Sequence, residues 1–189
     1  MYWRGRFMTV MEFILVAHAI LTGLGIAEVL RGFADLIRAV PATTSRRLIG
    51  IAAWALFLLF QLWWAVWRVG TRDKWSFADF LVMLLPVVIL YLLARISFPK
   101  EIDGADLKQY YERTSPALWF LVAGVYISFA IFQPILYGSF QPVLLTTQVV
   151  IAVAALVATR VESKMFQFTL LAFMIVQVAW RGVILTIGT

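Results

Sequence analysis

Polar and ionisable residues recur inside long apolar stretches of this sequence. Glu12 and His18 stand in the first stretch, and the later stretches carry Gln61, Asp79, Gln148, Gln177 and Arg181. Ionisable groups in hydrocarbon are costly and commonly mark ion pathways, proton relays or binding sites. The chemistry that these residue types could support is therefore the passage or the sensing of an ion, a small solute or a proton.

The depth of these residues follows from helix geometry. At about 1.5 Å per helical residue, Glu12 is expected roughly 7 Å below the membrane face that holds the chain termini, and His18 near the midplane. The glutamines fall in the same half of the bilayer, with Asp79 and Arg181 closer to its surface. One hypothesis is a polar vestibule with Glu12 as its charged element and Arg181 as the counter-charge. The alternative is ordinary hydrogen bonding between helices.

His18 is the only histidine in the chain. Imidazole titrates near neutral pH in water, so His18 could relay protons or sense pH. The plainer interpretation is an interior histidine with a satisfied hydrogen bond, and a haem ligand shared between two subunits is a third option. One histidine and no cysteine exclude disulfides, thiolate metal sites and a multi-histidine cage within one chain. We therefore expect no cofactor and no metal.

Helices that span a membrane must position these residues. Of the 189 residues, 63% are hydrophobic and 14% charged, against about a quarter charged in soluble domains. We therefore predict an all-α fold: one transmembrane domain over 1–189, a bundle of six helices that could form two three-helix halves. Stretches of about 20 apolar residues suffice to span a bilayer, and they are predicted at 7–30, 48–67, 77–98, 115–137, 142–159 and 165–187.

Two further segments are predicted at the membrane face opposite the termini. The first helix continues over 31–40 until Pro41, and the loop 99–116 contains an amphipathic helix over 105–113. Each segment can be a solvated surface or a docking surface for a partner. The candidate contact residues follow one side of the first helix at a spacing that allows ion pairs: Glu28, Arg31, Asp35 and Arg38.

The distribution of positive charge predicts the orientation. Most of the 16 Lys and Arg residues fall on the face opposite the termini, and cytoplasmic loops carry the excess of positive residues. Both termini are therefore expected outside the cytoplasm. The net charge of +6 indicates contact with anionic lipid headgroups at the cytoplasmic face rather than with nucleic acid. The other expected partners of the chain are the lipid bilayer and either further copies of the chain or another membrane subunit.

Several short segments resemble a group of small bacterial multi-span membrane proteins. They are Met11-Glu-Phe, the stretch from Gly23 to Gly32, Gln61-Leu-Trp-Trp64, the span with Pro86, and Phe98-Pro99 followed by an acidic loop and Tyr110-Tyr111. The resemblance covers about 1–115 and implies a multi-pass protein of the bacterial inner (plasma) membrane. No activity is known for that group, so the resemblance implies no functional residue.

The motifs of well-understood membrane machines and enzymes are absent from the sequence. It has no regular Arg ladder, no carbonyl-filter signature, no phosphate-binding loop and no Ser–His–acid arrangement. We therefore expect no enzyme, with a lipid-modifying enzyme as the least favoured option. The first hypothesis is a small ion or solute conductor, or a sensor, that uses the polar layer. The alternative is a non-catalytic accessory or scaffold subunit that uses 31–40 and 99–116.

Overall fold

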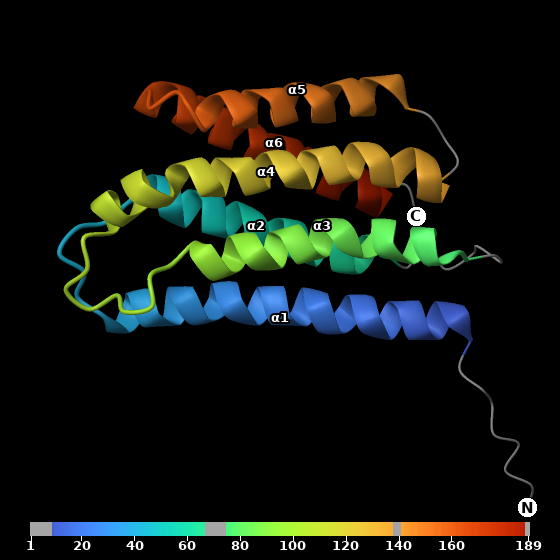
Figure 1. Cartoon of the computed structure of the whole chain (residues 1–189), viewed down its shortest axis with the longest axis horizontal. Coiled ribbons are helices and arrows are strands. Elements are labelled where there is room, and N and C mark those ends of the chain that lie inside the picture. The colour runs from blue at the N-terminus through green and yellow to red at the C-terminus, as the bar shows by residue number, and fades with distance from the viewer. Residues whose placement is uncertain (1–8, 67–74, 138–140, 188–189) are drawn as a thin grey trace, which may run out of the picture.

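The computed structural model is a bundle of long helices (Figure 1). It describes residues 9–66, 75–137 and 141–187. No strand occurs within these ranges, apart from one isolated bridge between Thr43 and Asp106. The all-α bundle predicted from the sequence is therefore confirmed, and its helices are α1 (Val10–Arg38), α2 (Arg46–Ala65), α3 (Phe77–Ile96), α4 (Leu107–Tyr137), α5 (Pro142–Ala158) and α6 (Lys164–Ile187).

The predicted continuation of the first helix agrees with the structure, since α1 runs without a break to Arg38. The segment predicted over 31–40 is thus the end of α1, and it stops two residues early because a residue that precedes a proline disfavours helical geometry. Residues 7, 8 and 67 of the predicted spans lie outside the described ranges.

The segment predicted over 99–116 is helical in its second half, in agreement with the helix predicted over 105–113, but that helix is not separate from the span predicted over 115–137. Helix α4 begins at Leu107 and passes through Pro116. It starts there because the Asp106 carboxylate accepts the backbone N–H groups of Lys108 and Gln109 at 3.0 and 2.9 Å, as an N-cap does. Pro116 removes one helical hydrogen bond, but buried side chains on both sides of it anchor the helix, namely Tyr111 and Trp119.

The helices form two rows. α1, α3, α4 and α5 pack in series, and α2 packs against both α1 and α6 in the second row (Figure 1). In the first half of the chain all three helices pack on one another, whereas α5 packs closely on α4 and more loosely on α6. The two predicted halves are thus packed differently. We call the end where α1 begins and α6 ends the terminal end, and the other end the distal end.

Four of the described helices have the length and composition of membrane spans. In α1, α2, α3 and α4 the most apolar stretch of 18 residues has a mean hydropathy of 2.1, 1.9, 2.5 and 1.8, and α5 is apolar but shorter. Large apolar side chains such as Phe13, Phe57, Phe120 and Phe173 are exposed. Such a surface is suited to lipid rather than water. The chain is thus a helical membrane protein, and a count of six spans stays a prediction.

Candidate functional site

Two carboxylates of the predicted polar layer close the first turns of their own helices. The N–H of Thr9 donates to Glu12 Oε2 at 2.7 Å, and the N–H of Ser76 donates to Asp79 Oδ2 at 2.9 Å. The cap hydroxyls accept the N–H groups of Glu12 and Asp79 in return. Each carboxylate therefore has a structural role in a capping box. The sequence carries the signal of both boxes, Thr-x-x-Glu and Ser-x-x-Asp before an apolar run, which the prediction of a polar layer overlooks.

His18 is buried on the inner face of α1. Its side chain is only 2% exposed, and its Nδ1 lies 3.3 Å from the hydroxyl oxygen of Thr22, one turn further along the helix. Thr22 is itself fully buried. The geometry matches an interior histidine with a hydrogen-bond partner on its own helix, and roles in proton relay or pH sensing stay predictions.

Two glutamines of the layer connect α6 to its neighbours. The Gln61 amide donates from α2 to the carbonyl oxygen of Val178 at 2.6 Å, and the Tyr126 hydroxyl donates from α4 to Gln177 Oε1 at 3.3 Å. On the same side of the bundle, the Arg181 guanidinium lies over the ring of Phe129 at 5.9 Å. These contacts are the interhelical bonds that the plainer hypothesis expects, whereas the pairing of Arg181 with the Glu12 carboxylate stays a prediction.

Gln148 differs from the other glutamines. It lies on the face of α5 that is buried, with 0% exposure, and neither its amide oxygen nor its amide nitrogen has a hydrogen-bond partner among the described residues. The amide nitrogen of Gln177 is also buried without a hydrogen-bond partner among the described residues. Buried polar atoms are nearly always hydrogen-bonded in folded proteins, so these amides mark places where water or a polar solute would be stabilised.

The distal end contains a cavity of about 350 Å³ between α1, α3 and the start of α4. Its walls include the candidate contact residues Glu28, Arg31 and Asp35, whereas Arg38 lies one turn beyond Asp35 at the exposed end of α1. The sequence predicted this row on α1 but not the residues that face it. Those are Arg95 on α3, Phe98 and Lys100 on the connection to α4, and Tyr110 on α4 itself.

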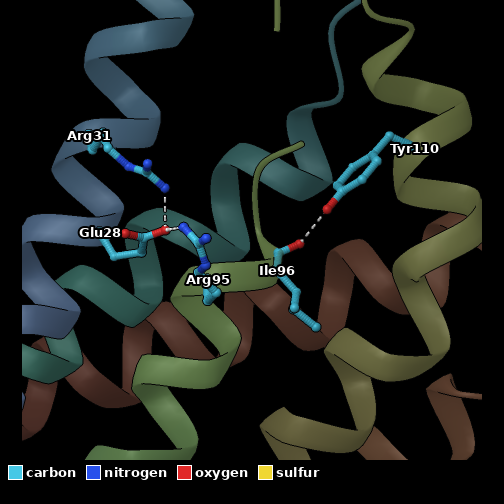
Figure 2. A network of polar contacts seen from close by, with 5 residues as sticks. All are labelled: Glu28, Arg31, Arg95, Ile96 and Tyr110. Atoms are coloured by element: carbon cyan, nitrogen blue, oxygen red, sulfur yellow. Dashed lines mark hydrogen bonds and ion pairs between the residues drawn. The ribbon is translucent and has the colours of Figure 1, made fainter. Parts of the chain in front are cut away.

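Glu28 organises the charges of this cavity. One carboxylate oxygen, Oε1, accepts from Arg31 Nη2 at 2.5 Å and from Arg95 Nη1 at 2.6 Å (Figure 2). The Glu28 side chain is 16% exposed, whereas those of Arg31 and Arg95 are 59% and 48% exposed. One carboxylate thus holds two guanidinium groups side by side, each with most of its five N–H donors still to be satisfied by water or a ligand.

Tyr110 ties α4 to the end of α3. Its hydroxyl donates to the carbonyl oxygen of Ile96 at 3.0 Å, across the connection from Arg95 (Figure 2). This carbonyl belongs to the last turn of α3, where no helical N–H is available to it. The tyrosine therefore fixes the α3–α4 corner that forms one wall of the cavity.

The two long connections of the distal end are bonded to each other. The N–H of Val40 donates to Asp103 Oδ1 at 3.2 Å, the N–H of Ala42 donates to the carbonyl of Ala105 at 3.0 Å, and the Thr43 hydroxyl donates to Asp106. The Thr43 hydroxyl and the N–H of Gln109 hold the pKa of the Asp106 carboxyl below its usual range. The distal end is thus a fixed surface built from both connections.

A buried polar network that the sequence did not predict lies deeper at the same end. Gln167 Oε1 accepts from Arg47 Nη1 at 2.6 Å and from the Tyr111 hydroxyl at 2.8 Å. The indole of Trp119 donates to the Tyr111 oxygen at 3.1 Å, and the Arg47 guanidinium lies 4.4 Å from the centre of the Tyr111 ring. All four side chains are buried. The network joins α2, α4 and α6 and stabilises a guanidinium inside the bundle.

The distal cavity presents charged side chains that can bind a ligand. Within the described ranges, no group of three His, Cys, Asp or Glu side chains is placed to hold a metal ion. His18 is hydrogen-bonded to the hydroxyl of Thr22 on its own helix. No known protein family, curated protein or solved structure matches the chain. The geometry of the distal end is therefore the basis on which a function is proposed.

Proposed function

We propose that the chain is a non-catalytic accessory or scaffold subunit of a larger membrane complex, and that its distal end receives the partner. The observation that carries this proposal is the set of hydrogen bonds that fix residues 40–43 to residues 103–106. Connections that only join helices are commonly mobile and variable. A bonded surface at the end of a bundle is suited to recognition because little ordering remains to be done when a partner binds.

The end of α1 supports the same proposal. The 29 residues of α1 extend over roughly 43 Å, which exceeds the roughly 30 Å of bilayer hydrocarbon. Its last turns and the residues that follow would therefore project beyond the hydrocarbon, yet Ile37 in the helix and Val40 just after it are 84% and 79% exposed. Apolar side chains outside lipid favour contact with another protein. Asp35 and Arg38 lie beside these apolar side chains, and their charges would set the orientation of the bound partner.

The size of the complex in mildly solubilised membranes tests the proposal. The wild-type chain should migrate in an assembly much larger than 21.5 kDa, and the double change Ile37→Ser with Arg38→Glu should reduce that size. Arg160→Glu is the matched control, since Arg160 is also exposed at the distal end but lies on the α5–α6 connection. A mass that is a multiple of the chain would identify copies of itself as the partner. An unchanged assembly in the double variant would reject the surface.

A second candidate function, a small ion or solute conductor or sensor, is favoured by one observation. The amide of Gln148 is fully buried and has no hydrogen-bond partner within the part of the chain that the structure describes, and the same holds for the amide nitrogen of Gln177. A chain of water along these amides would form a polar path in the half of the bundle that also holds Glu12. Proton and monovalent-cation flux into proteoliposomes should then exceed that of empty liposomes and be lost in Gln148→Leu and in Glu12→Gln. Thr147→Val is the control, and absence of wild-type flux would reject this function.

A further inference from the structure

We propose that the distal cavity binds the phosphate group of an anionic ligand through Arg31, Arg95 and Lys100. The inference goes beyond the scaffold function, because it assigns a small-ligand site to residues that the partner surface at Ile37 and Arg38 does not need. The cavity volume of about 350 Å³ lies within the range of pockets that hold small ligands.

The geometry of the two arginines is the first argument. Two neighbouring guanidinium groups repel each other. Here the Glu28 carboxylate keeps them together on the cavity wall, because its Oε1 accepts from Arg31 at 2.5 Å and from Arg95 at 2.6 Å. Each uses one N–H group in this contact. The remaining donors are in the planar arrangement that matches the oxygen atoms of phosphate. Because both side chains are about half exposed, a ligand can reach these donors.

The charge balance of the cavity is the second argument. Its lining contains three cations, Arg31, Arg95 and Lys100, and two carboxylates, Glu28 and Asp35. The Glu28 charge is shared between both arginines, so the cavity keeps an excess of positive charge. A phosphate monoester or diester presents several acceptor oxygens at once and can therefore contact more than one of these cations. A single carboxylate has fewer oxygens to share among them.

The position of the cavity is the third argument. Glu28 lies 18 residues after the start of α1, which places it roughly 27 Å along the helix, near the far edge of a hydrocarbon layer of about 30 Å. Lipid phosphates lie at that level. The apolar part of the lining, with Gly32, Ala94 and Phe98, can contact the glycerol and upper acyl part of a lipid. A soluble phosphate compound would enter the same cavity from the aqueous side.

Binding to the purified full chain tests this site and distinguishes the two sources. Thermal stabilisation of the chain in a neutral detergent is measured with added phosphatidylglycerol, phosphatidylcholine, glycerol 3-phosphate or inorganic phosphate. We expect saturable stabilisation by phosphatidylglycerol, with an apparent affinity at least about tenfold lower in Arg31→Gln/Arg95→Gln because charge-assisted hydrogen bonds are lost. Saturation by phosphatidylglycerol alone identifies a lipid. Saturation by the soluble phosphates as well identifies the phosphate group itself as sufficient.

Two further variants keep the test decisive. Lys100→Gln changes a cavity cation that is exposed on the connection, so it should fold and still weaken binding several-fold. Arg38→Gln removes an arginine of the same helix outside the cavity lining and should bind as the wild type does. Wild-type affinity in both cavity variants, or no saturable binding of any of the four compounds, would overturn the inference. Failure of the partner surface would leave this result unaffected, because Ile37 and Arg38 lie outside the cavity lining.

Discussion

Gly32 lies against the ring of Phe98, and the missing side chain at residue 32 is what makes room for that ring. A Cβ atom at residue 32 would lie 2.1 Å from Phe98 Cδ2 and 2.5 Å from Cε2. The ring is 9% exposed and meets Phe33 edge-on, with 5.4 Å between the ring centres. This contact joins α1 to the exit from α3 and forms part of the lining of the distal cavity.

Gly32→Ala should therefore destabilise the chain. The added Cβ would overlap the Phe98 ring, so the ring or the backbone beside it must move, and overpacking of this kind costs about 1–3 kcal/mol. Gly23→Ala is the matched control on the same helix, since its Cβ would meet nothing within 4 Å and alanine is the better helix former by about 1 kcal/mol. Thermal unfolding in detergent should thus give changes of opposite sign. Equal changes in the two variants would contradict the proposed contact.

The buried network around Gln167 gives a second prediction. Gln167→Leu leaves the Arg47 guanidinium and the Tyr111 hydroxyl without their shared acceptor, and an unsatisfied buried group costs about 1–3 kcal/mol, more when it is charged. Trp119→Phe removes only one donor from the same network and should cost about 0.5–1.5 kcal/mol. The free energy of unfolding, measured in denaturant with constant detergent, compares the two. A smaller loss in Gln167→Leu than in Trp119→Phe would show that Arg47 does not depend on the amide.

The contact between Asp106 and Thr43 predicts a stability that depends on pH. The Asp106 pKa is lowered in the folded chain, first by the Thr43 hydroxyl and then by the N–H of Gln109. Its contribution is thus fully present above the ordinary aspartate pKa of about 3.9 and is lost as pH falls through the lower folded value. Asn also caps helices, so Asp106→Asn keeps a cap and removes the titration. The stability difference between wild type and variant should be constant near neutral pH and shrink in acid; a difference that stays constant down to about pH 2 would refute it.

The helices could be predicted from the sequence because each is a long apolar run between clear stop signals. The first helix ends before Pro41 as expected, and α4 and α5 are separate helices that end at Tyr137 and begin at Pro142. Pro116 does not end a helix, because the Asp106 cap starts α4 earlier and buried side chains hold the helix across the proline. The start of α4 depends on contacts with Thr43, and contacts between distant segments leave no local pattern in the sequence.

The predicted site could be recovered only in part, for a related reason. The spacing of Glu28 and Arg31 on one helix indicated their ion pair, but Arg95 approaches from another helix, and helix rotation cannot be determined from periodicity in so apolar a chain. The role of Gln167 could not be predicted for the same reason. It stands near the start of the apolar run 165–187, and its partners Arg47 and Tyr111 are on other helices. Glu12 and Asp79 were different, since their capping motifs are legible in the sequence, whereas the prediction considered only their depth in the membrane.

The balance of positive charge along the sequence predicts which side of the membrane the distal end faces. Ten of the 16 Lys and Arg residues fall toward the distal end and six toward the terminal end, and positive residues concentrate on the cytoplasmic side of a membrane. Because the chain contains no cysteine, single substitutions report the side directly. Glu162 is exposed at the distal end, and Gln141 is exposed at the terminal end. Gln141 makes no side-chain capping bond, so neither Glu162→Cys nor Gln141→Cys should disturb the fold. In intact bacterial spheroplasts an impermeant maleimide should label the Gln141→Cys thiol and reach the Glu162→Cys thiol only after lysis. The reverse order would place the distal cavity outside the cell, and labelling of both before lysis would show that these two ends do not lie on opposite sides of a membrane.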